Sequence, residues 1–382
     1  MQQLTSNSQV VHIRDDALTE VATIWDELAP ERVFFVVDER AYANSGARSI
    51  MSPWLKSINL TTFSGFEPNP KLEDVQAGVD LFRSADPDLV VALGGGTAID
   101  LAKMIATFAS SQANLRELAT GLAPITGRSV PLVVIPTTAG TGSEATHFAV
   151  VYVDGQKYSV ADSCMLPDYV LIDPKLTYSL PASMTSSTGL DAFCQAIESI
   201  WAVQSTDQSF EYATAAVRLC LKHLLPAVHN PTAKARLGMC RASHLAGKAI
   251  NISKTTLPHA ISYAITSTYR IPHGQAVALT LSSALAFNAG VTQNDCNDPR
   301  GVKHVIDRLH WIQHLLGTSS IDAACAELRH FIAATGNAAS LIDAGIRNHL
   351  ELQRIAEQVN AVRLANNPRT GTQADLVHIL SE

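Results

Sequence analysis

The chain has 382 residues, of which 47% are hydrophobic and 16% charged, and its formal net charge is −7. This length allows two domains with separate cores, and the acidic balance argues against a nucleic-acid partner, because phosphate backbones bind clustered Lys and Arg. No apolar run approaches the roughly 20 residues of a membrane span, and residues 1–5 lack a signal-peptide pattern. We therefore expect a cytoplasmic protein with no membrane partner. The six cysteines show no CxxC spacing, which indicates reduced thiols.

Strands and helices alternate in the first half of the chain. The run 33–37 is short, continuous and rich in Val and Phe, as expected of a strand covered on both faces. An amphipathic helix is predicted over 70–83, followed by a second buried strand over 88–93. This strand, helix, strand order with short turns predicts a parallel sheet.

A glycine-rich loop, Gly94-Gly95-Gly96-Thr97, leads from the second strand directly into a helix over 98–103. Glycines let the backbone approach a ligand closely, and a helix N-terminus offers free N–H groups to a pyrophosphate. The loop therefore favours a dinucleotide site, although it is not a GxGxxG fingerprint. A tight turn that needs positive φ is the alternative.

A third strand, predicted over 131–135, runs into a loop of small hydroxyl residues and glycines over 136–144. This composition suits hydrogen bonds to phosphate and ribose oxygens, although an ordinary Thr/Gly loop is the alternative. Residues 150–160 are expected to form a hairpin with an Asp-Gly turn, and 168–172 a strand that closes the sheet. The hydroxyl side chains of the loop that we assign to cofactor binding are Thr137, Thr138, Thr141 and Ser143.

The second half is predicted to be helical. No β-rich run follows residue 186, and a 3.6-residue apolar periodicity is clear over 191–201, 209–225, 232–250 and 302–316. We place the domain boundary at 179–183, because Pro181 and the small residues after it are expected to interrupt any regular element.

Seven short motifs are spread over most of the chain. They are FEPNP at 66–70, GGGTAIDLAK at 94–103, PTTAGTGSE at 136–144, DPKLT at 173–177, GLDA at 189–192, PHG at 272–274 and NPR at 367–369. In this order they resemble the iron-containing, group III alcohol dehydrogenases, which share their fold with glycerol dehydrogenase and dehydroquinate synthase. The resemblance implies an α/β dinucleotide-binding domain over 1–180 and an all-helical metal- and substrate-binding domain over 181–382. It also implies that NAD(P) and a metal are held in a cleft between these domains. Finally, it suggests a homodimer built by a strand from the first thirty or so residues of the chain.

The resemblance also places Asp38 against the adenosine ribose. A carboxylate there accepts a hydrogen bond from a 2′-hydroxyl and repels a 2′-phosphate, so NAD(H) is favoured over NADP(H), with Arg40 nearby weakening the preference. Alternatively, Asp38 simply ends a strand. The remaining cofactor-binding residues that the resemblance implies are Gly94, Gly95, Gly96, Thr97, Asp100 and Lys157, together with the hydroxyl residues named above.

The metal ligands implied by the resemblance are Asp191, His259 and His273, with Gln195 in the place of a third histidine. The i,i+4 spacing puts Gln195 on the same helix face as Asp191, but a neutral amide oxygen holds a late first-row ion less well than imidazole does. Three outcomes stay open: a metal held by three ligands plus Gln195 or water, a weakly held metal, or none, as in maleylacetate reductases. The ion is Fe²⁺ or Zn²⁺.

The expected chemistry is hydride transfer from a nicotinamide lying against the loop 140–143 to an aldehyde whose oxygen the metal polarises. Tyr263, one turn after His259, is a candidate proton donor, beside a water chain or the cofactor ribose. A core aromatic with a satisfied hydroxyl is the equally weighted alternative for Tyr263.

The segment 251–256 carries a Lys and several hydroxyl residues, which suits a pocket for a tetrahedral oxyanion. With Gln195 and Tyr263, the run 254–263 resembles the phosphonoacetaldehyde reductase branch of the family, which makes 2-hydroxyethylphosphonate, and Lys254 would then bind the phosphonate. The alternatives are a solvated Lys254 in a general short-chain alcohol or diol dehydrogenase acting on lactaldehyde or glycerol, a dehydroquinate synthase-like cyclase, or a non-catalytic binding protein.

Overall fold

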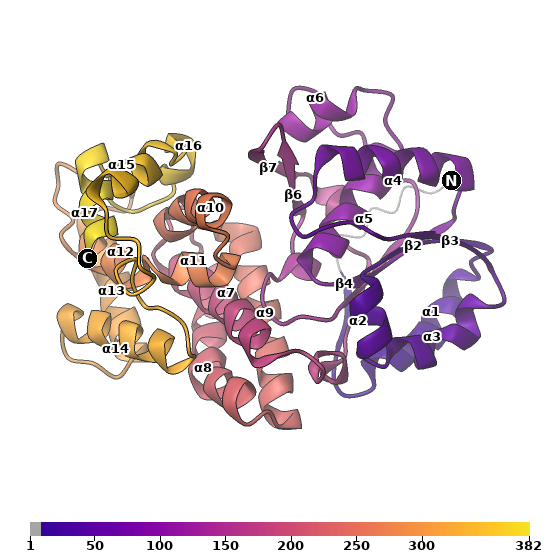
Figure 1. Ribbon diagram of the computed structural model, residues 1–382, viewed down its shortest axis with the longest axis horizontal. Coiled ribbons are helices and arrows are strands. Elements are labelled where there is room, and N and C mark those ends of the chain that lie inside the picture. Colours follow the sequence, from indigo (N-terminus) through magenta and orange to yellow (C-terminus); the bar gives the residue numbers. More distant parts are fainter. Residues whose placement is uncertain (1–8) are drawn as a thin grey trace. The chain divides into compact units, whose positions relative to one another are not determined.

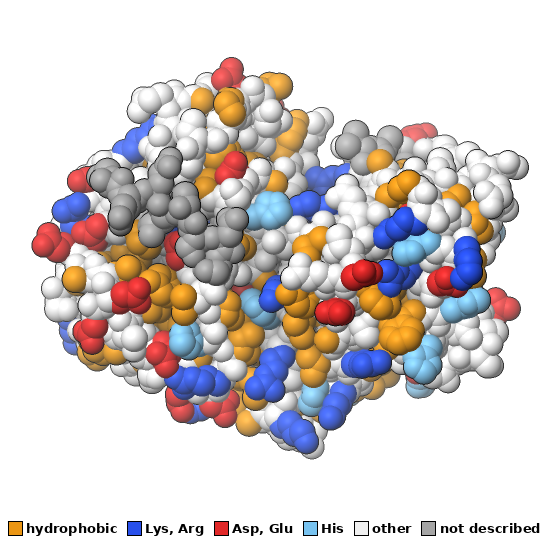
Figure 2. Space-filling view, turned by 180° about the vertical axis from the view of Figure 1, so that it is seen from behind, with side chains coloured by type: hydrophobic (Ala, Val, Ile, Leu, Met, Phe, Trp, Pro, Cys, Tyr) orange, Lys and Arg blue, Asp and Glu red, His pale blue; other side chains and the backbone are white. Residues whose placement is uncertain are grey.

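The structure is a computed structural model that describes residues 9–382 and divides into two compact units, Met1–Leu180 and Pro181–Glu382 (Figure 1). The absent signal-peptide pattern at 1–5 lies outside the described residues. Within the described part of the chain, no helix combines the length and apolarity that crossing a membrane requires. Figure 2 shows acidic and basic side chains on the face that it presents.

The first unit is built on a six-stranded sheet in which every pair of neighbouring strands is parallel. The strand order is β1 (Val10–Ile13), β8 (Tyr169–Ile172), β5 (Leu132–Pro136), β4 (Leu89–Gly94), β2 (Arg32–Val37) and β3 (Asn59–Phe63). The four inner strands match the predicted ones, because a strand covered on both faces reads as a continuous apolar run. The edge strands β1 and β3 were not predicted, since their residues are mostly part-exposed and only partly apolar.

Helices cover both faces of this sheet (Figure 1). Phe35 belongs to a core cluster with Trp25 and Met51, whereas the next side chain back, Phe34, packs edge-on against Phe82 at a centroid distance of 5.2 Å. This alternation is the period of two that a strand imposes. The elements on the first face are η1 (Ala17–Glu20), α1 (Val21–Leu28), α2 (Glu39–Asn44) and α3 (Ala47–Leu55), and those on the second are α4 (Leu72–Ala85), α5 (Gly96–Phe108) and α6 (Leu115–Thr120).

The predicted hairpin is confirmed as β6 (Phe148–Val153) and β7 (Gln156–Ala161), which form a separate two-stranded sheet. Its two turn residues, Asp154 and Gly155, both have positive φ, of 49° and 76°. That conformation defines the type I′ turn, whose twist matches the strands it joins. Short 3-10 turns complete the unit at η2 (Ser143–Ala145), η3 (Ser163–Met165) and η4 (Pro174–Thr177).

The second unit is helical, and its described residues contain no strand. Its first three helices, α7 (Ala182–Trp201), α8 (Asp207–His229) and α9 (Ala233–Ser253), pack on one another, and the later ones follow α9 in chain order (Figure 1). The later helices are α10 (Leu257–Tyr269), α11 (His273–Ala278), α12 (Leu281–Ala289), α13 (Val302–Leu315), α14 (Ile321–Ala334), α15 (His349–Glu357), α16 (Ala361–Leu364) and α17 (Gln373–Ser381).

One local prediction was wrong. The residues after Pro181 do not interrupt regular structure, because α7 already begins at Ala182 with Pro181 as its N-cap. A proline at a helix start loses no hydrogen bond, and its fixed φ suits the first turn. The helix that carries Asp191 therefore begins at Ala182, more than a full turn before residue 191, where the apolar periodicity began.

Candidate active site

Two loops of the first unit meet at the carboxyl edge of the parallel sheet. Helix α5 begins at Gly96, immediately after β4, and no side chain caps its N-terminus. A Cβ atom on Gly96 would lie 2.9 Å from the Thr141 hydroxyl oxygen, and one on Gly95 would lie 3.5 Å from that of Thr138. The glycines thus let the Thr/Gly-rich loop pack directly against the start of α5, as the sequence suggested.

Asp38 lies at the same sheet edge, because β2 is the parallel neighbour of β4. It is the N-cap of α2, and its Oδ1 atom accepts hydrogen bonds from the backbone N–H groups of Arg40 and Ala41, each at 3.0 Å. Asp38 therefore both follows the end of β2 and caps the start of α2. The carboxyl edge beside a point where the strand order reverses is where open α/β sheets bind ligands.

Asp100 and Lys103, one turn apart on α5, hold the end of the Thr/Gly-rich loop. The Asp100 carboxylate accepts hydrogen bonds from the Ser143 hydroxyl and, at 2.9 Å, from the Val150 N–H. Lys103 is fully buried, and its Nζ donates to the backbone oxygens of Ser143, Thr146 and Phe148 at 2.5, 2.8 and 2.9 Å.

Burial lowers the pKa of Lys103 to about 8. The sequence reasoning gave Lys103 no role, although a lysine on the buried side of an otherwise apolar helix is a signal for one. Lys157, which we assigned to the cofactor, lies on β7 opposite Tyr152.

Replacing Lys103 by Met should destabilise the first unit strongly. The three backbone oxygens that accept from Nζ would lose a charged donor, and a hydrogen bond to a charged group contributes about 1.5–3 kcal/mol. We expect the free energy of unfolding, measured by urea denaturation, to fall by about 3 kcal/mol or more. Lys56→Met, at an exposed position, is the matched control and should change it little. A loss below about 1 kcal/mol in K103M would contradict this account.

In the second unit, three predicted metal ligands converge. The ligand atoms of Asp191, His259 and His273 all lie within 4.8 Å of one another. The Asp191 Oδ1 atom is 3.3 Å from Nε2 of His259 and 4.0 Å from Nε2 of His273. The chain reverses between the two histidines at Arg270, which has φ 56° and ends α10, so that His273 opens α11.

Gly274 permits this convergence. A Cβ atom at that position would lie 2.0 Å from the Ser187 carbonyl oxygen and 2.8 Å from the Asp191 nitrogen. Such distances are far inside van der Waals contact, so only glycine lets α11 approach α7 this closely. The glycine of the PHG motif thus fixes the position of His273 relative to Asp191.

Gln195 and Glu198 extend the polar stripe of Asp191 along α7, and all three side chains are buried. Glu198 was missed from the sequence, although residues 191, 195 and 198 follow the i, i+4, i+7 spacing of one helix face. Its Oε1 atom bonds Nδ1 of His259, and its Oε2 accepts from the N–H and the hydroxyl of Thr256 at 2.8 and 2.9 Å.

Burial alone would lower the pKa of His259, but the carboxylates of Glu198 and Asp191 outweigh it and raise that pKa to about 9. The metal-free imidazole is therefore charged at neutral pH, which stabilises it between its two carboxylate neighbours. A metal ion at this site would take the place of that proton.

Tyr263 lies beside the second histidine. Its ring stacks on the His273 ring at a centroid distance of 5.8 Å and an interplanar angle of 8°. The guanidinium of Arg363 lies over the same tyrosine ring, 4.5 Å from its centroid. Arg363 was missed from the sequence, because it comes from α16, a hundred residues further along the chain. A permanent positive charge thus lies next to the ring that contacts a candidate ligand.

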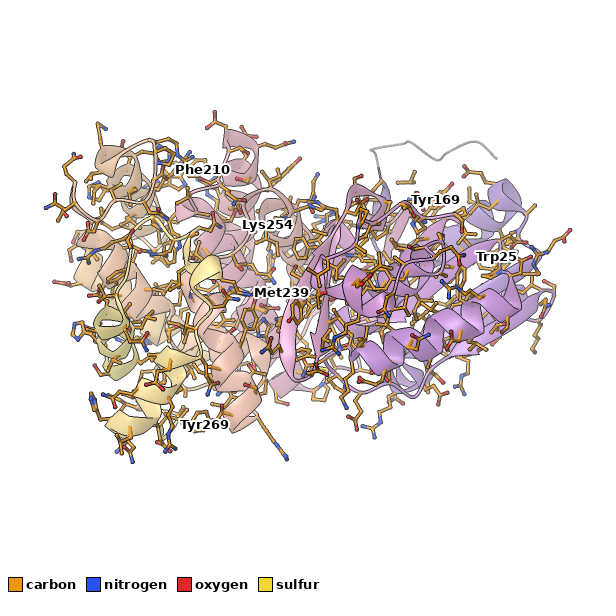
Figure 3. All side chains as sticks on the ribbon, turned by 90° about the horizontal axis from the view of Figure 1, so that it is seen from above. Trp25, Tyr169, Phe210, Met239, Lys254 and Tyr269 are labelled. Atoms are coloured by element: carbon orange, nitrogen blue, oxygen red, sulfur yellow. The ribbon has the colours of Figure 1, made fainter. Side chains whose placement is uncertain are left out.

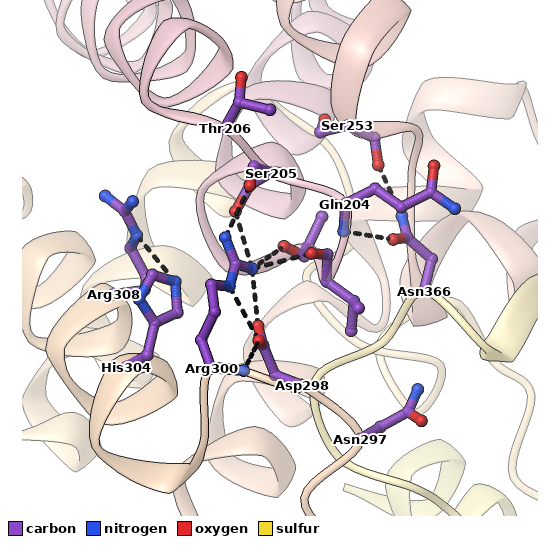
Figure 4. A network of polar contacts seen from close by, with 12 residues as sticks. Gln204, Ser205, Thr206, Ser253, Asn297, Asp298, Arg300, His304, Arg308 and Asn366 are labelled. Carbon is purple, nitrogen blue, oxygen red and sulfur yellow. Dashed lines mark hydrogen bonds and ion pairs between the residues drawn. The ribbon is translucent and has the colours of Figure 1, made fainter.

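Lys254 ends α9 in a conformation that is unusual for a residue with a side chain. Its φ of 60° and ψ of −178° lie in a region that is essentially restricted to glycine. Asn366 holds the flanking peptide groups, since its Nδ2 donates to the carbonyl of Ser253 at 2.7 Å (Figure 4) and to that of Thr255 at 2.9 Å. Lys254 is partly buried within the helical unit (Figure 3), and this burial lowers the pKa of its ammonium group.

Comparison with known proteins identifies relatives for both units. A family model described as iron-containing alcohol dehydrogenase matches residues 8–174, and the model for the C-terminal part of that family matches 185–382. The chain is 35% identical to phosphonoacetaldehyde reductase of Streptomyces viridochromogenes, covering 81% of this chain and 80% of that protein. It is 32% identical to 1-propanol dehydrogenase PduQ of Citrobacter freundii, covering 85% of each.

Among solved structures, sulfoacetaldehyde reductase of Bifidobacterium kashiwanohense in complex with NAD⁺ superposes with a TM-score of 0.86. The two chains are 26% identical, and the match covers 100% of this chain and 98% of that one. Both family models and the fold agree with the resemblance found in the sequence. The chain is therefore an oxidoreductase and belongs to the iron-containing alcohol dehydrogenase family.

Proposed function

We propose that this chain catalyses the NADH-dependent, metal-assisted reduction of a small anionic aldehyde, with phosphonoacetaldehyde to 2-hydroxyethylphosphonate as the best candidate. The observation that carries the proposal is Lys254, a cation kept in a backbone conformation that favours glycine, five residues before the candidate ligand His259. Residues held in such regions of φ and ψ cluster at functional sites. In this proposal, unit Met1–Leu180 binds the dinucleotide and unit Pro181–Glu382 binds the metal and the aldehyde.

The donor set in the helical unit fits a divalent metal. One carboxylate and two imidazoles with ligand atoms within 4.8 Å of one another are the donors that catalytic zinc and non-haem iron sites use. Gln195, one turn after Asp191 and buried, would be a weaker fourth donor. Because the carboxylate and both histidines lie together in space, we favour a metal-dependent enzyme over a metal-free, maleylacetate reductase-like one.

The proposed reaction divides the work among these residues. When bound, a divalent ion would act as a Lewis acid on the aldehyde oxygen and NADH would supply the hydride. Asp191, His259 and His273 hold the ion, and Lys254 binds the anionic group of the substrate and thereby orients its carbonyl carbon. The Tyr263 hydroxyl donates a proton to the oxygen as the alcohol forms, and the Arg363 guanidinium lies over the ring of that tyrosine.

The relatives support an anionic substrate. One is named for phosphonoacetaldehyde and another for sulfoacetaldehyde, and both of those compounds are two-carbon aldehydes that end in a tetrahedral oxyanion. Lys254, five residues before His259 in the sequence, and Arg363, over the ring that stacks on His273, suit that shared chemistry, because charge-assisted hydrogen bonds to phosphoryl oxygens are strong. A general short-chain alcohol dehydrogenase is the second candidate, since 1-propanol dehydrogenase is also a relative.

The decisive experiment compares NADH oxidation by the metal-replete enzyme with phosphonoacetaldehyde, sulfoacetaldehyde, propanal and lactaldehyde at equal concentrations. A much higher kcat/KM for the anionic aldehydes supports the proposal, and the ratio between the two anions then identifies the preferred one. Equal or higher values for the neutral aldehydes would overturn the anion site and leave the second candidate.

We also propose a cytoplasmic homodimer, with the edge strand β1 as the pairing element.

Cofactor choice is proposed to depend on Asp38. One of its carboxylate oxygens caps α2, and the other would accept a hydrogen bond from the ribose 2′-hydroxyl of NADH and repel the 2′-phosphate of NADPH. Asp38→Asn keeps a capping oxygen but removes the charge. We expect the ratio of kcat/KM for NADPH to that for NADH to rise about tenfold, which corresponds to ~1.4 kcal/mol. Glu39→Gln, the adjacent residue, is the control, and an unchanged ratio in D38N would refute the assignment.

A further inference from the structure

Glu198 uses one carboxylate oxygen to cap the start of α10 and the other to contact the imidazole of His259. It is fully buried, on the same face of α7 as Asp191 and Gln195. Its Oε2 accepts the N–H of Thr256, the N-cap residue of α10, at 2.8 Å, and lies 3.5 Å from the N–H of His259 in the first turn of that helix. A carboxylate at this place satisfies N–H groups that the helix itself leaves without partners and interacts favourably with the helix dipole.

The other oxygen determines the tautomer of His259. Oε1 of Glu198 contacts Nδ1 of the imidazole, and an ionised carboxylate can only accept, so Nδ1 carries the hydrogen. The lone pair of the neutral ring is then on Nε2, the atom that faces Asp191 Oδ1 at 3.3 Å. The geometry thus directs Nε2 toward the cluster of candidate ligands.

A chain of hydrogen bonds fixes the carboxylate in turn. The Thr256 hydroxyl donates to Oε2 at 2.9 Å, and it accepts from the indole Nε1 of Trp201 at 2.8 Å. Thr256 and Trp201 are both almost completely buried. Trp201, Thr256, Glu198 and His259 therefore form a continuous buried network that ends at the ligand atom, with little freedom for the imidazole to rotate.

We propose that Glu198 is the positioning residue of the metal site: through Nδ1 it holds His259 in the orientation and tautomer that present Nε2 to the ion. This role rests on the metal site of the proposed function. Carboxylates behind ligating histidines raise ligand basicity and fix ring orientation, and their loss typically lowers metal affinity about 10- to 100-fold.

The test measures Zn²⁺ binding and not activity. Wild type, Glu198→Gln and the control Glu211→Gln, the same change at an exposed position of the same unit, are stripped with a chelator and titrated with Zn²⁺ in competition with a chromophoric chelator. We expect E198Q to bind Zn²⁺ about 10- to 100-fold more weakly and E211Q to bind as wild type does. The visible absorption bands of the Co²⁺-loaded proteins should shift in E198Q and not in E211Q, because only the first changes the ligand geometry and basicity.

The outcomes are separable. If Glu198 served only to cap α10, E198Q would lower the unfolding midpoint while Zn²⁺ affinity and the Co²⁺ spectrum stayed at wild-type values, and the proposal would be overturned. If the wild-type protein bound no Zn²⁺, the proposed metal site itself would be refuted. The comparison of substrates would still test the proposed anion site independently. Should E198Q fail to fold, Glu198→Asp retains the charge but withdraws it from Nδ1, and the same loss of affinity is expected of it.

Discussion

Replacing Lys254 by Gly should separate substrate choice from stability. The ammonium group is the proposed partner of the phosphonate, and a hydrogen bond to a charged group contributes about 1.5–3 kcal/mol. The kcat/KM for phosphonoacetaldehyde should therefore fall about 10- to 150-fold, whereas that for propanal should change less than threefold. Steady-state NADH oxidation with the two aldehydes measures this difference directly.

The same substitution should raise the stability of the protein. Glycine adopts the φ of 60° and ψ of −178° found at Lys254 without a Cβ clash, and a side chain in that region costs about 1–3 kcal/mol. We expect Lys254→Gly to have a higher Tm than wild type. A lysine that merely starts a loop in water would still give the gain in stability but not the selectivity change.

Ala29→Gly is the matched control for this experiment. Ala29 also combines a side chain with positive φ, of 43°, at a helix end, but it is exposed and belongs to the unit Met1–Leu180, which carries none of the candidate metal ligands. Its replacement should raise Tm without changing the preference between the two aldehydes. If K254G and A29G behave alike in both assays, the strain at Lys254 has no functional meaning.

Removing the Asp191 carboxylate should have the largest effect on turnover. Asp191→Asn keeps the size of the side chain but loses the only carboxylate in the ligand cluster of Asp191, His259 and His273 among the described residues. Lewis-acid stabilisation contributes several kcal/mol, so kcat/KM should fall at least about 1000-fold. Metal content by atomic emission should fall with it.

Gln195→Ala is the comparison for that variant. It lies on the same face of α7 and is equally buried, but an amide is a weak donor that water can replace. We expect its kcat/KM to fall about tenfold at most. A D191N enzyme that lacks metal and still retains a tenth of the wild-type rate would show that the reaction does not depend on the ion.

The sequence by itself determined the fold class and the family of this protein. The inner strands of a parallel sheet are buried on both faces, so they read as continuous apolar runs, and β2, β4, β5 and β8 were found within one or two residues. The glycine-rich and Thr/Gly-rich loops were recognisable because close backbone approach needs particular small residues. The edge strands β1 and β3 and the true start of α7 were missed, because part-exposed strands and polar first turns carry little apolar pattern.

Only the tertiary structure decided how the candidate site is supported. Glu198 contacts His259 across 61 positions of sequence, and Arg363 reaches Tyr263 from α16. The spacing of residues 191, 195 and 198 places Glu198 on the face of α7 that carries Asp191, but it does not specify the distant partner, because buried charges find their partners on neighbouring helices only in the folded chain. The strained backbone conformation of Lys254 is likewise held by a distant residue, because Asn366 donates hydrogen bonds to the carbonyls of Ser253 and Thr255 on either side of Lys254. Sequence motifs therefore predicted that Asp191, His259 and His273 come together, and packing between distant helices decided which other side chains surround them.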